Sequence, residues 1–291
     1  NYSLPPDIGK HNLKVWIDAP NNNIDQLTGN NQYDFEYIVY DFSKARQRTP
    51  LIEVFTSSTC GPCVGGNIAL KGTLDASDDN WTCVKYQMNF PSSGDPYYTN
   101  ECGTRSNYYS VSGVPHLVAN GRTQTSPYAY KNEELQTSQK VPAFVDMIAD
   151  YKVSGHTVDV NVKMTASDDI NSNTLRLYVG IIEYQTFKNV GTNGETEFEY
   201  VMKKLVPGSS GKSISSLKIG EPVSEAFSYT FNGNYRLPSN AGSPINHSIE
   251  HSVEDFNNLS VVVWLQDINT KEIFQSTWAT ITSSTNNLDD S

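Results

Sequence analysis

Two cysteines separated by two residues, Cys60-Gly61-Pro62-Cys63, have the spacing for thiol–disulfide chemistry. An apolar run at 51–55 precedes them and predicts a buried strand, and Pro62 suits the first turn of a helix, where its missing N–H costs nothing. A cysteine at a helix N-terminus faces unpaired N–H groups, which stabilise the thiolate and lower its pKa. The arrangement predicts thiol–disulfide exchange, with Cys60 as the attacking thiolate and Cys63 as the resolving cysteine.

The same spacing occurs in half of a zinc site, so the other cysteines distinguish the two interpretations. Cys83 and Cys102 do not form a second pair of this kind, and neither has a histidine at ligand spacing. We therefore expect no metal. His247 and His251 would share one face of a helix and could hold an ion there, but two exposed polar side chains are the simpler interpretation. No nucleotide-binding loop or catalytic triad is found in the sequence, and we expect no cofactor.

A proline downstream points to the same chemistry as the cysteine pair. Ser112-Gly113-Val114-Pro115 precedes a short apolar run. It resembles the segment of thioredoxin-like domains in which a cis-proline begins the strand that faces the C-x-x-C motif. The resemblance implies that Cys60 and Cys63 are catalytic and that Val114 and Pro115 shape a substrate groove. The alternative is an ordinary turn proline.

Two positions depart from thioredoxins and predict slow exchange. Thr59 stands where a tryptophan usually precedes the motif. Val54 stands where thioredoxins place a buried aspartate that helps to deprotonate the resolving cysteine, and Glu53 would point to the opposite face of the strand. His116, which follows Pro115, either modulates the Cys60 pKa or is simply a strand residue.

Length and charge limit the class of protein. The 291 residues suit two or more domains, and the net charge of −11 argues against nucleic acid and against an anionic membrane surface. No run approaches the roughly 18 apolar residues of a membrane span, so we expect no transmembrane segment. Four cysteines favour an oxidising compartment. The chain begins without an initiator methionine or a signal peptide, so we expect a mature or trimmed product.

The first 45 residues predict a β-hairpin followed by a linker. Alternating residues at 11–18 and 33–41 predict two strands that each bury one face. A polar, asparagine-rich loop separates them. The hairpin resembles the closing pair of strands of bacterial cell-adhesion-related immunoglobulin-like domains.

Residues 46–152 are expected to form a thioredoxin-like domain. A strand is predicted at 81–88, a helix from Pro96 that carries Cys102 on its buried stripe, and a last helix over 141–151. Because adjacent core elements can bring two Cα atoms within disulfide distance, we expect a bridge between Cys83 and Cys102. The alternative is two buried free thiols.

From residue 156 the hydrophobic period changes to two, with short strands separated by regular turns. This pattern predicts an all-β sandwich over 153–282, followed by a disordered tail at 283–291. The predicted fold class is therefore an α/β thioredoxin-like domain plus an all-β immunoglobulin-like sandwich.

Several motifs in both halves resemble the twenty-eight-kilodalton outer-membrane-protein-related family over about 46–282. They are Phe55-Thr56 before the cysteine pair, Asp95-Pro96-Tyr97, Ser112-Gly113-Val114-Pro115, Gly191-Thr192-Asn193-Gly194-Glu195, Trp264-Leu265-Gln266-Asp267 and Lys271-Glu272. The resemblance implies a thioredoxin-like domain fused to a β-sandwich, on the surface of Gram-negative bacteria or secreted by them. Many relatives carry a type IX secretion sorting domain after the sandwich, and a chain that stops at Ser291 would suit its removal.

Two hypotheses for function follow. In the first, an extracellular or outer-membrane-surface protein carries out weak thiol–disulfide exchange on a protein substrate through Cys60 and Cys63. In the second, Cys60–Cys63 is a structural disulfide and the chain is a non-catalytic module that binds a surface partner. Exposure of the Cys60 sulfur distinguishes them.

Overall fold

The computed structural model describes residues 7–17, 23, 25–78 and 80–282, which fall into two compact units, 1–45 and 46–291. The first unit contains an antiparallel hairpin of β1 (Gly9–Trp16) and β2 (Gln32–Val39), with Leu13 opposite Phe35. The two predicted strands are confirmed. Residues of the predicted buried faces, such as Val15 and Phe35, are exposed, so that buried face is not found within this unit. The predicted disordered tail at 283–291 lies outside the described residues.

The second unit is built on one large mixed sheet with the order β16-β15-β9-β10-β4-β3-β5-β6, and a short strand, β11, pairs with β9. Strands from the beginning and the end of the unit therefore belong to the same sheet. Their bounds are β3 Leu51–Thr56, β4 Thr82–Gln87, β5 His116–Ala119, β6 Thr123–Thr125, β9 Leu175–Thr186, β10 Phe198–Val206, β11 Lys212–Ser213, β15 Leu259–Asp267 and β16 Ile273–Trp278.

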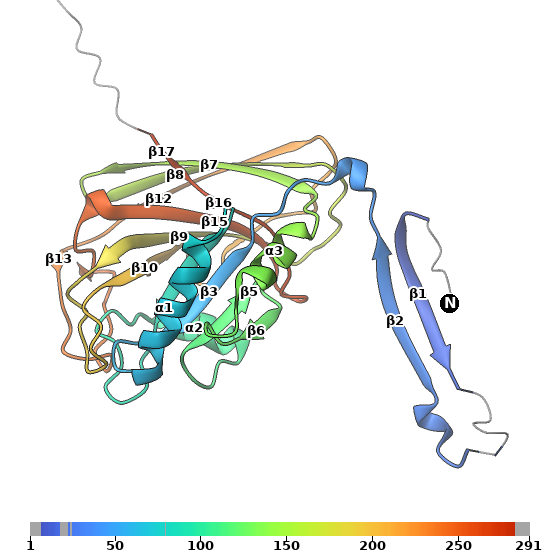
Figure 1. Cartoon of the computed structure of the whole chain (residues 1–291). Coiled ribbons are helices and arrows are strands. Elements are labelled where there is room, and N and C mark those ends of the chain that lie inside the picture. Colours follow the sequence, from blue (N-terminus) through green and yellow to red (C-terminus); the bar gives the residue numbers. More distant parts are fainter. Residues whose placement is uncertain (1–6, 18–22, 24, 79, 283–291) are drawn as a thin grey trace, which may run out of the picture. The chain divides into compact units, whose positions relative to one another are not determined.

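A smaller sheet with the order β12-β8-β7-β17 covers one face of the large sheet at its β9–β15 end (Figure 1). Its strands β7 (Val145–Ser154) and β8 (Thr157–Ala166) alternate between buried and exposed residues, as expected for strands with one face in a core. The remaining strands are β12 Pro222–Thr230, β17 Thr280–Ile281 and a separate pair, β13 Asn234–Tyr235 with β14 Glu250–His251.

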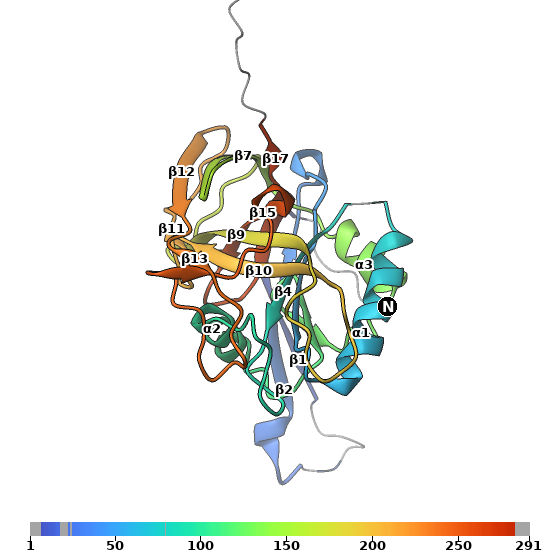
Figure 2. The ribbon, with the colours of Figure 1, turned by 90° about the vertical axis from the view of Figure 1, so that its left-hand side faces the viewer.

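Three α-helices flank the other end of the large sheet in the described part of the chain. They are α1 Gly61–Asp75, α2 Asn100–Tyr109 and α3 Asn132–Lys140. Figure 2 shows α1 and α3 on one side of β4 and α2 on the other. The predicted burial of Cys102 in α2 is confirmed, and Arg105 and Tyr109 are buried as well. No helix in the described ranges is long and apolar enough to cross a membrane.

The predicted fold class is wrong. Instead of an α/β thioredoxin-like domain beside a separate immunoglobulin-like sandwich, β9 and β15 join β10, β4 and β3 in one continuous sheet. One face of β9 and β15 packs against the smaller sheet through residues such as Val179 and Val263. The opposite face packs into the helix-covered core through Tyr178 and Trp264. β9 and β15 are therefore buried on both faces and contribute residues to two hydrophobic cores.

The predicted helix over 141–151 is also wrong. The helix lies earlier, as α3, and the chain from Val145 onwards is the strand β7. Met147, Ala149 and Tyr151 are buried while Ile148 is exposed, which is an alternation of period two. The helix is predicted from the helical spacing of Val141, Phe144, Val145 and Ile148. The segment from Val145 is a strand instead because it pairs with β8 along its whole length.

A buried ion pair connects β3, which comes early in the sequence of this unit, to β15, which comes late. Glu53 of β3 is fully buried and binds Arg105 of α2 through two contacts, Nε to Oε1 at 2.6 Å and Nη2 to Oε2 at 3.0 Å. The hydroxyls of Tyr86 and Tyr109 also donate to Glu53. Arg105 donates in addition to Gln266 of β15 at 2.7 Å. This network links β3, β4, α2 and β15.

Candidate functional site

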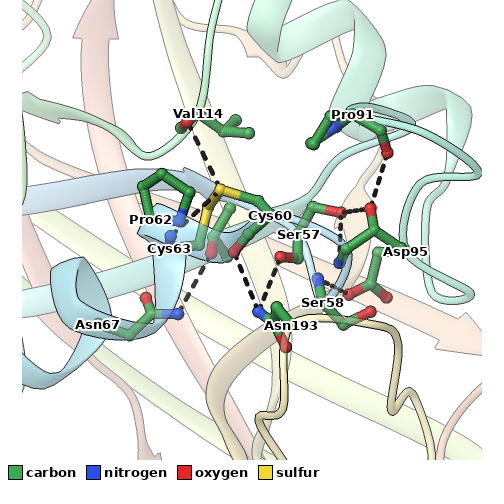
Figure 3. The surroundings of a disulfide bond; sticks show 12 residues. Ser57, Ser58, Cys60, Pro62, Cys63, Asn67, Pro91, Asp95, Val114 and Asn193 are labelled. Atoms are coloured by element: carbon green, nitrogen blue, oxygen red, sulfur yellow. Dashed lines mark hydrogen bonds between the residues drawn. A yellow bond between two sulfur atoms is a disulfide. The ribbon is translucent and has the colours of Figure 1, made fainter.

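The cysteine pair lies at the start of α1, as the sequence predicts. Cys60 is the N-cap residue of the helix, and its Sγ accepts the Cys63 backbone N–H at 3.2 Å. The two cysteines form a disulfide (Figure 3). This predicted bond is therefore present.

Both sulfur-bearing residues are buried. Cys60 is 1% exposed and Cys63 is fully buried, whereas Gly61 and Pro62 between them are exposed. The peptide bond between Val114 and Pro115 is cis, as expected. The Val114 carbonyl oxygen lies 3.5 Å from Cys60 Sγ, so this segment sits directly against the disulfide. Whether Val114 and Pro115 shape a substrate groove stays a prediction.

The loop between β3 and the disulfide is held by a buried carboxylate. Asp95 accepts hydrogen bonds from the backbone N–H groups of Ser58 and Tyr97 and from the side-chain amide of Asn189. Burial raises the pKa of Asp95, and these donors oppose that rise. Thr59, at the position where thioredoxins have tryptophan, donates through its hydroxyl to the Pro91 carbonyl at 2.7 Å. The residues before Cys60 are thus anchored at several points.

A second loop, between β9 and β10, clamps the backbone of the disulfide turn. The Asn193 amide donates to the carbonyl oxygens of Ser57 and Cys60 at 3.3 and 3.2 Å, and its backbone N–H donates to Ser58 (Figure 3). Glu195 then connects Asn193 to Asn67 of α1 by accepting an amide hydrogen bond from each. In the sequence, 191–195 is notable only as one of the motifs that resemble the outer-membrane-protein-related family. This contact could not be predicted, because a single sequence does not show which loops meet.

The neighbouring acid and histidine do not reach the sulfurs. Glu53 lies on the opposite face of β3 from Thr56, the residue that contacts Asn67 of α1, so no β3 carboxylate replaces the aspartate missing at Val54. His116 lies 3.1 Å from the Gln124 side chain, and its ring packs 6.3 Å from Phe55. Burial lowers the pKa of His116. These contacts make His116 a strand residue.

The expected bridge between Cys83 and Cys102 is absent from the structure, in which both are free and buried thiols. The reason is that the two cysteines lie on opposite faces of the sheet. Tyr86 of β4 shares Glu53 with Arg105 and so lies on the α2 face. Cys83 is three residues away and therefore points to the other face, where α1 packs. The sheet separates it from Cys102.

We expect neither thiol to react in the native protein. Burial raises the pKa of Cys83 and of Cys102 to about 12 in each case, which leaves no thiolate at neutral pH. A thiol assay at pH 8 on unreduced protein should detect none before denaturation and two per chain in guanidinium. Two missing thiols after denaturation would instead indicate the bridge.

His247 and His251 do not share a helix. His251 lies in β14 and His247 in the turn before it. Among the residues that the structure describes, no group of three histidine, cysteine, aspartate or glutamate side chains could hold a metal ion.

Comparison with known proteins gives structural likeness at low identity. HBP35 of Porphyromonas gingivalis matches with a TM-score of 0.58 and 12% identity, covering 82% of this chain and 78% of that one. A crystal structure of a protein from Agrobacterium tumefaciens matches with a TM-score of 0.51 and 14% identity, covering 81% and 95%. These likenesses show that the fold is shared with proteins of known structure.

A domain of the outer membrane lipoprotein Omp28 from Porphyromonas gingivalis also matches, at 14% identity over 48% of this chain and 89% of that one. Its TM-score of 0.29 is too low to show a shared fold. No protein-family model and no curated protein matches the chain.

Proposed function

We propose that this chain is a non-catalytic binding or accessory module of the cell exterior, in which Cys60–Cys63 is a structural disulfide. The observation that supports this is the burial of both residues, at 1% and 0% exposure. A thiolate must reach a sulfur along the S–S axis before it can exchange with it. Here the Val114 carbonyl lies against Cys60 Sγ, and Asp95 and Asn193 hold the backbone of Ser58 and Cys60 at the start of the turn.

An exported location is part of the proposal. Disulfides persist in oxidising compartments, and a bond that closes so short a loop stabilises by only roughly 2 kcal/mol, so it needs such a compartment to endure. The sequence motifs that resemble the twenty-eight-kilodalton outer-membrane-protein-related family support the same location. Membership of that family and type IX secretion are proposed on those motifs alone.

The test measures the reduction potential and the activity of the same protein. The native chain is equilibrated in graded glutathione buffers, quenched by alkylation and analysed by mass spectrometry. We expect a potential below about −300 mV, the range of structural disulfides. In an insulin-reduction assay, wild type and a Cys60→Ser, Cys63→Ser variant should be indistinguishable. Wild-type activity that the double variant lacks would overturn the proposal.

The second candidate, thiol–disulfide exchange through Cys60, has one observation in its favour. Cys60 caps α1, so a thiolate formed there on reduction would face the N–H groups of the first helical turn. Exchange then requires the Val114 segment to move away from the sulfur. A measured potential well above −300 mV, together with insulin reduction lost in the variant, would establish this candidate instead.

A further inference from the structure

A pocket of about 330 Å³ lies beside α1, on the sheet face opposite α2. This volume falls in the usual range for small-molecule sites, about 300–1,000 Å³. Its floor is formed by Thr56 of β3 with Lys85 and Gln87 of β4. Lys85 and Gln87 share one face of the strand because they are two residues apart, and Thr56 is the cross-strand partner of Gln87. One wall is α1 and the other is the segment 194–199.

Gln87 is a buried amide without a hydrogen-bond partner. It is 1% exposed, and neither its Nε2 nor its Oε1 has a partner within the described part of the chain. The Oδ1 of Asn67, on the neighbouring wall, is likewise buried without a partner. Leaving such groups unpaired costs about 1–3 kcal/mol each, so native proteins keep few of them without a reason.

Lys85 brings a buried positive charge to the same floor. It is 4% exposed, and no carboxylate of the described residues lies within ion-pair distance of it. The three glutamates of the facing wall are engaged elsewhere. Glu195 binds Asn67 and Asn193, Glu197 binds Gln185, and Glu199 pairs with Lys71 at 3.2 Å. The Lys85 Nζ lies 5.8 Å from the centre of the Tyr200 ring, a contact that supplies no full negative charge, so its ammonium still suits an anionic group.

We propose that this pocket binds a free α-amino acid, with its carboxylate at Lys85 and Gln87. The unpaired donors on the floor suit a carboxylate, and the unpaired Oε1 of Gln87 and Oδ1 of Asn67 suit an ammonium. Three wall glutamates disfavour a phosphate or another dianion and favour a ligand that also carries a positive charge. Phe198 and Val64 provide apolar surface for a side chain.

This inference depends on one part of the proposed function, namely that the chain is a binding module. Its test is calorimetric titration of the oxidised full chain with pooled L-amino acids, then with each that binds. Butyrate, which has no ammonium, and butylamine, which has no carboxylate, should each bind at least about tenfold more weakly than the amino acid. Lys85→Met should weaken amino-acid binding about tenfold or more, because a hydrogen bond to a charged group is lost. The matched control Lys140→Met removes an exposed lysine of α3 and should leave binding unchanged.

A second variant separates binding from structural support. Gln87→Met keeps the volume of the side chain and removes the unpaired amide, so the ligand-free protein should melt at the same or a higher temperature while amino-acid binding falls. A lower melting temperature with unchanged binding would make Gln87 structural and overturn the proposal. The absence of binding by the whole pool would overturn it too, whatever the redox assays of the disulfide show.

Discussion

Glu53→Gln is expected to lower the free energy of unfolding by about 3–5 kcal/mol, the usual effect of removing one partner from a buried ion pair. The variant keeps the shape of the side chain but leaves the Arg105 guanidinium, 2% exposed, without its countercharge. Tyr86 and Tyr109 also lose a charged acceptor. Urea titration followed by tryptophan fluorescence measures the loss.

The control for this variant is Glu221→Gln, which removes an exposed carboxylate and should change stability by less than about 0.5 kcal/mol. The double variant Glu53→Gln, Arg105→Met should cost less than the sum of the two single variants, because the uncompensated charge disappears. A Glu53→Gln effect as small as that of the control would show that the ion pair does not hold the two ends of the sheet together.

Acid is expected to destabilise the protein through His247. Burial, together with the nearby positive charges of Lys204, His251 and Lys203, lowers the pKa of His247 to about 4. Its Nε2 is buried without a hydrogen-bond partner. In the unfolded chain the same group titrates near its ordinary pKa of about 6.5. Between these values the unfolded chain binds a proton that the folded chain does not, so stability falls as the pH falls from about 6.5 towards 4.

The expected size of this effect is about 2–3 kcal/mol by pH 4.5. Other groups titrate in the same interval, so the measurement is a difference between wild type and His247→Asn. Unfolding free energies are determined for both at pH 7.5 and pH 4.5. Wild type should lose about 2–3 kcal/mol more than the variant over this interval. Parallel losses in the two proteins would show that His247 is not responsible.

The local elements around the disulfide could be predicted from sequence because their signals are short-range. The apolar run, the proline in the first helical turn and the capping cysteine predicted the β3–α1 unit, and α2 followed from its stripe. The assembly of the sheet could not be predicted in the same way. Residues 175–182 contain an alternating apolar series, which matches a one-sided strand, but Tyr178 and Ile182 on the other face are buried as well.

The contacts that enclose the candidate site were beyond sequence analysis for a related reason. Asn193 lies more than a hundred positions from Cys60, and nothing in a polar glycine-rich turn indicates which backbone it will clamp. The pairing of Glu53 with Arg105 could not be predicted for the same reason, since the two residues lie on different elements. A charged residue within an apolar strand does signal a buried partner, and that signal can be searched for in other sequences.

The order of strands in the large sheet has a consequence for biosynthesis. β3 is among the first elements of its unit to be synthesised. The hydrogen-bond network of its residue Glu53 nevertheless extends to Gln266 in β15, and β16, the sheet neighbour of β15, is nearly the last element. The network around Glu53 therefore lacks its β15 contact until the ribosome has added Gln266. Well before that point β3 can already pair with β4 and β5, but β4 lacks its other neighbour, β10, until Val206 has been added, and such incomplete intermediates are prone to aggregate. We therefore expect this unit to complete its folding only after β15 has been synthesised.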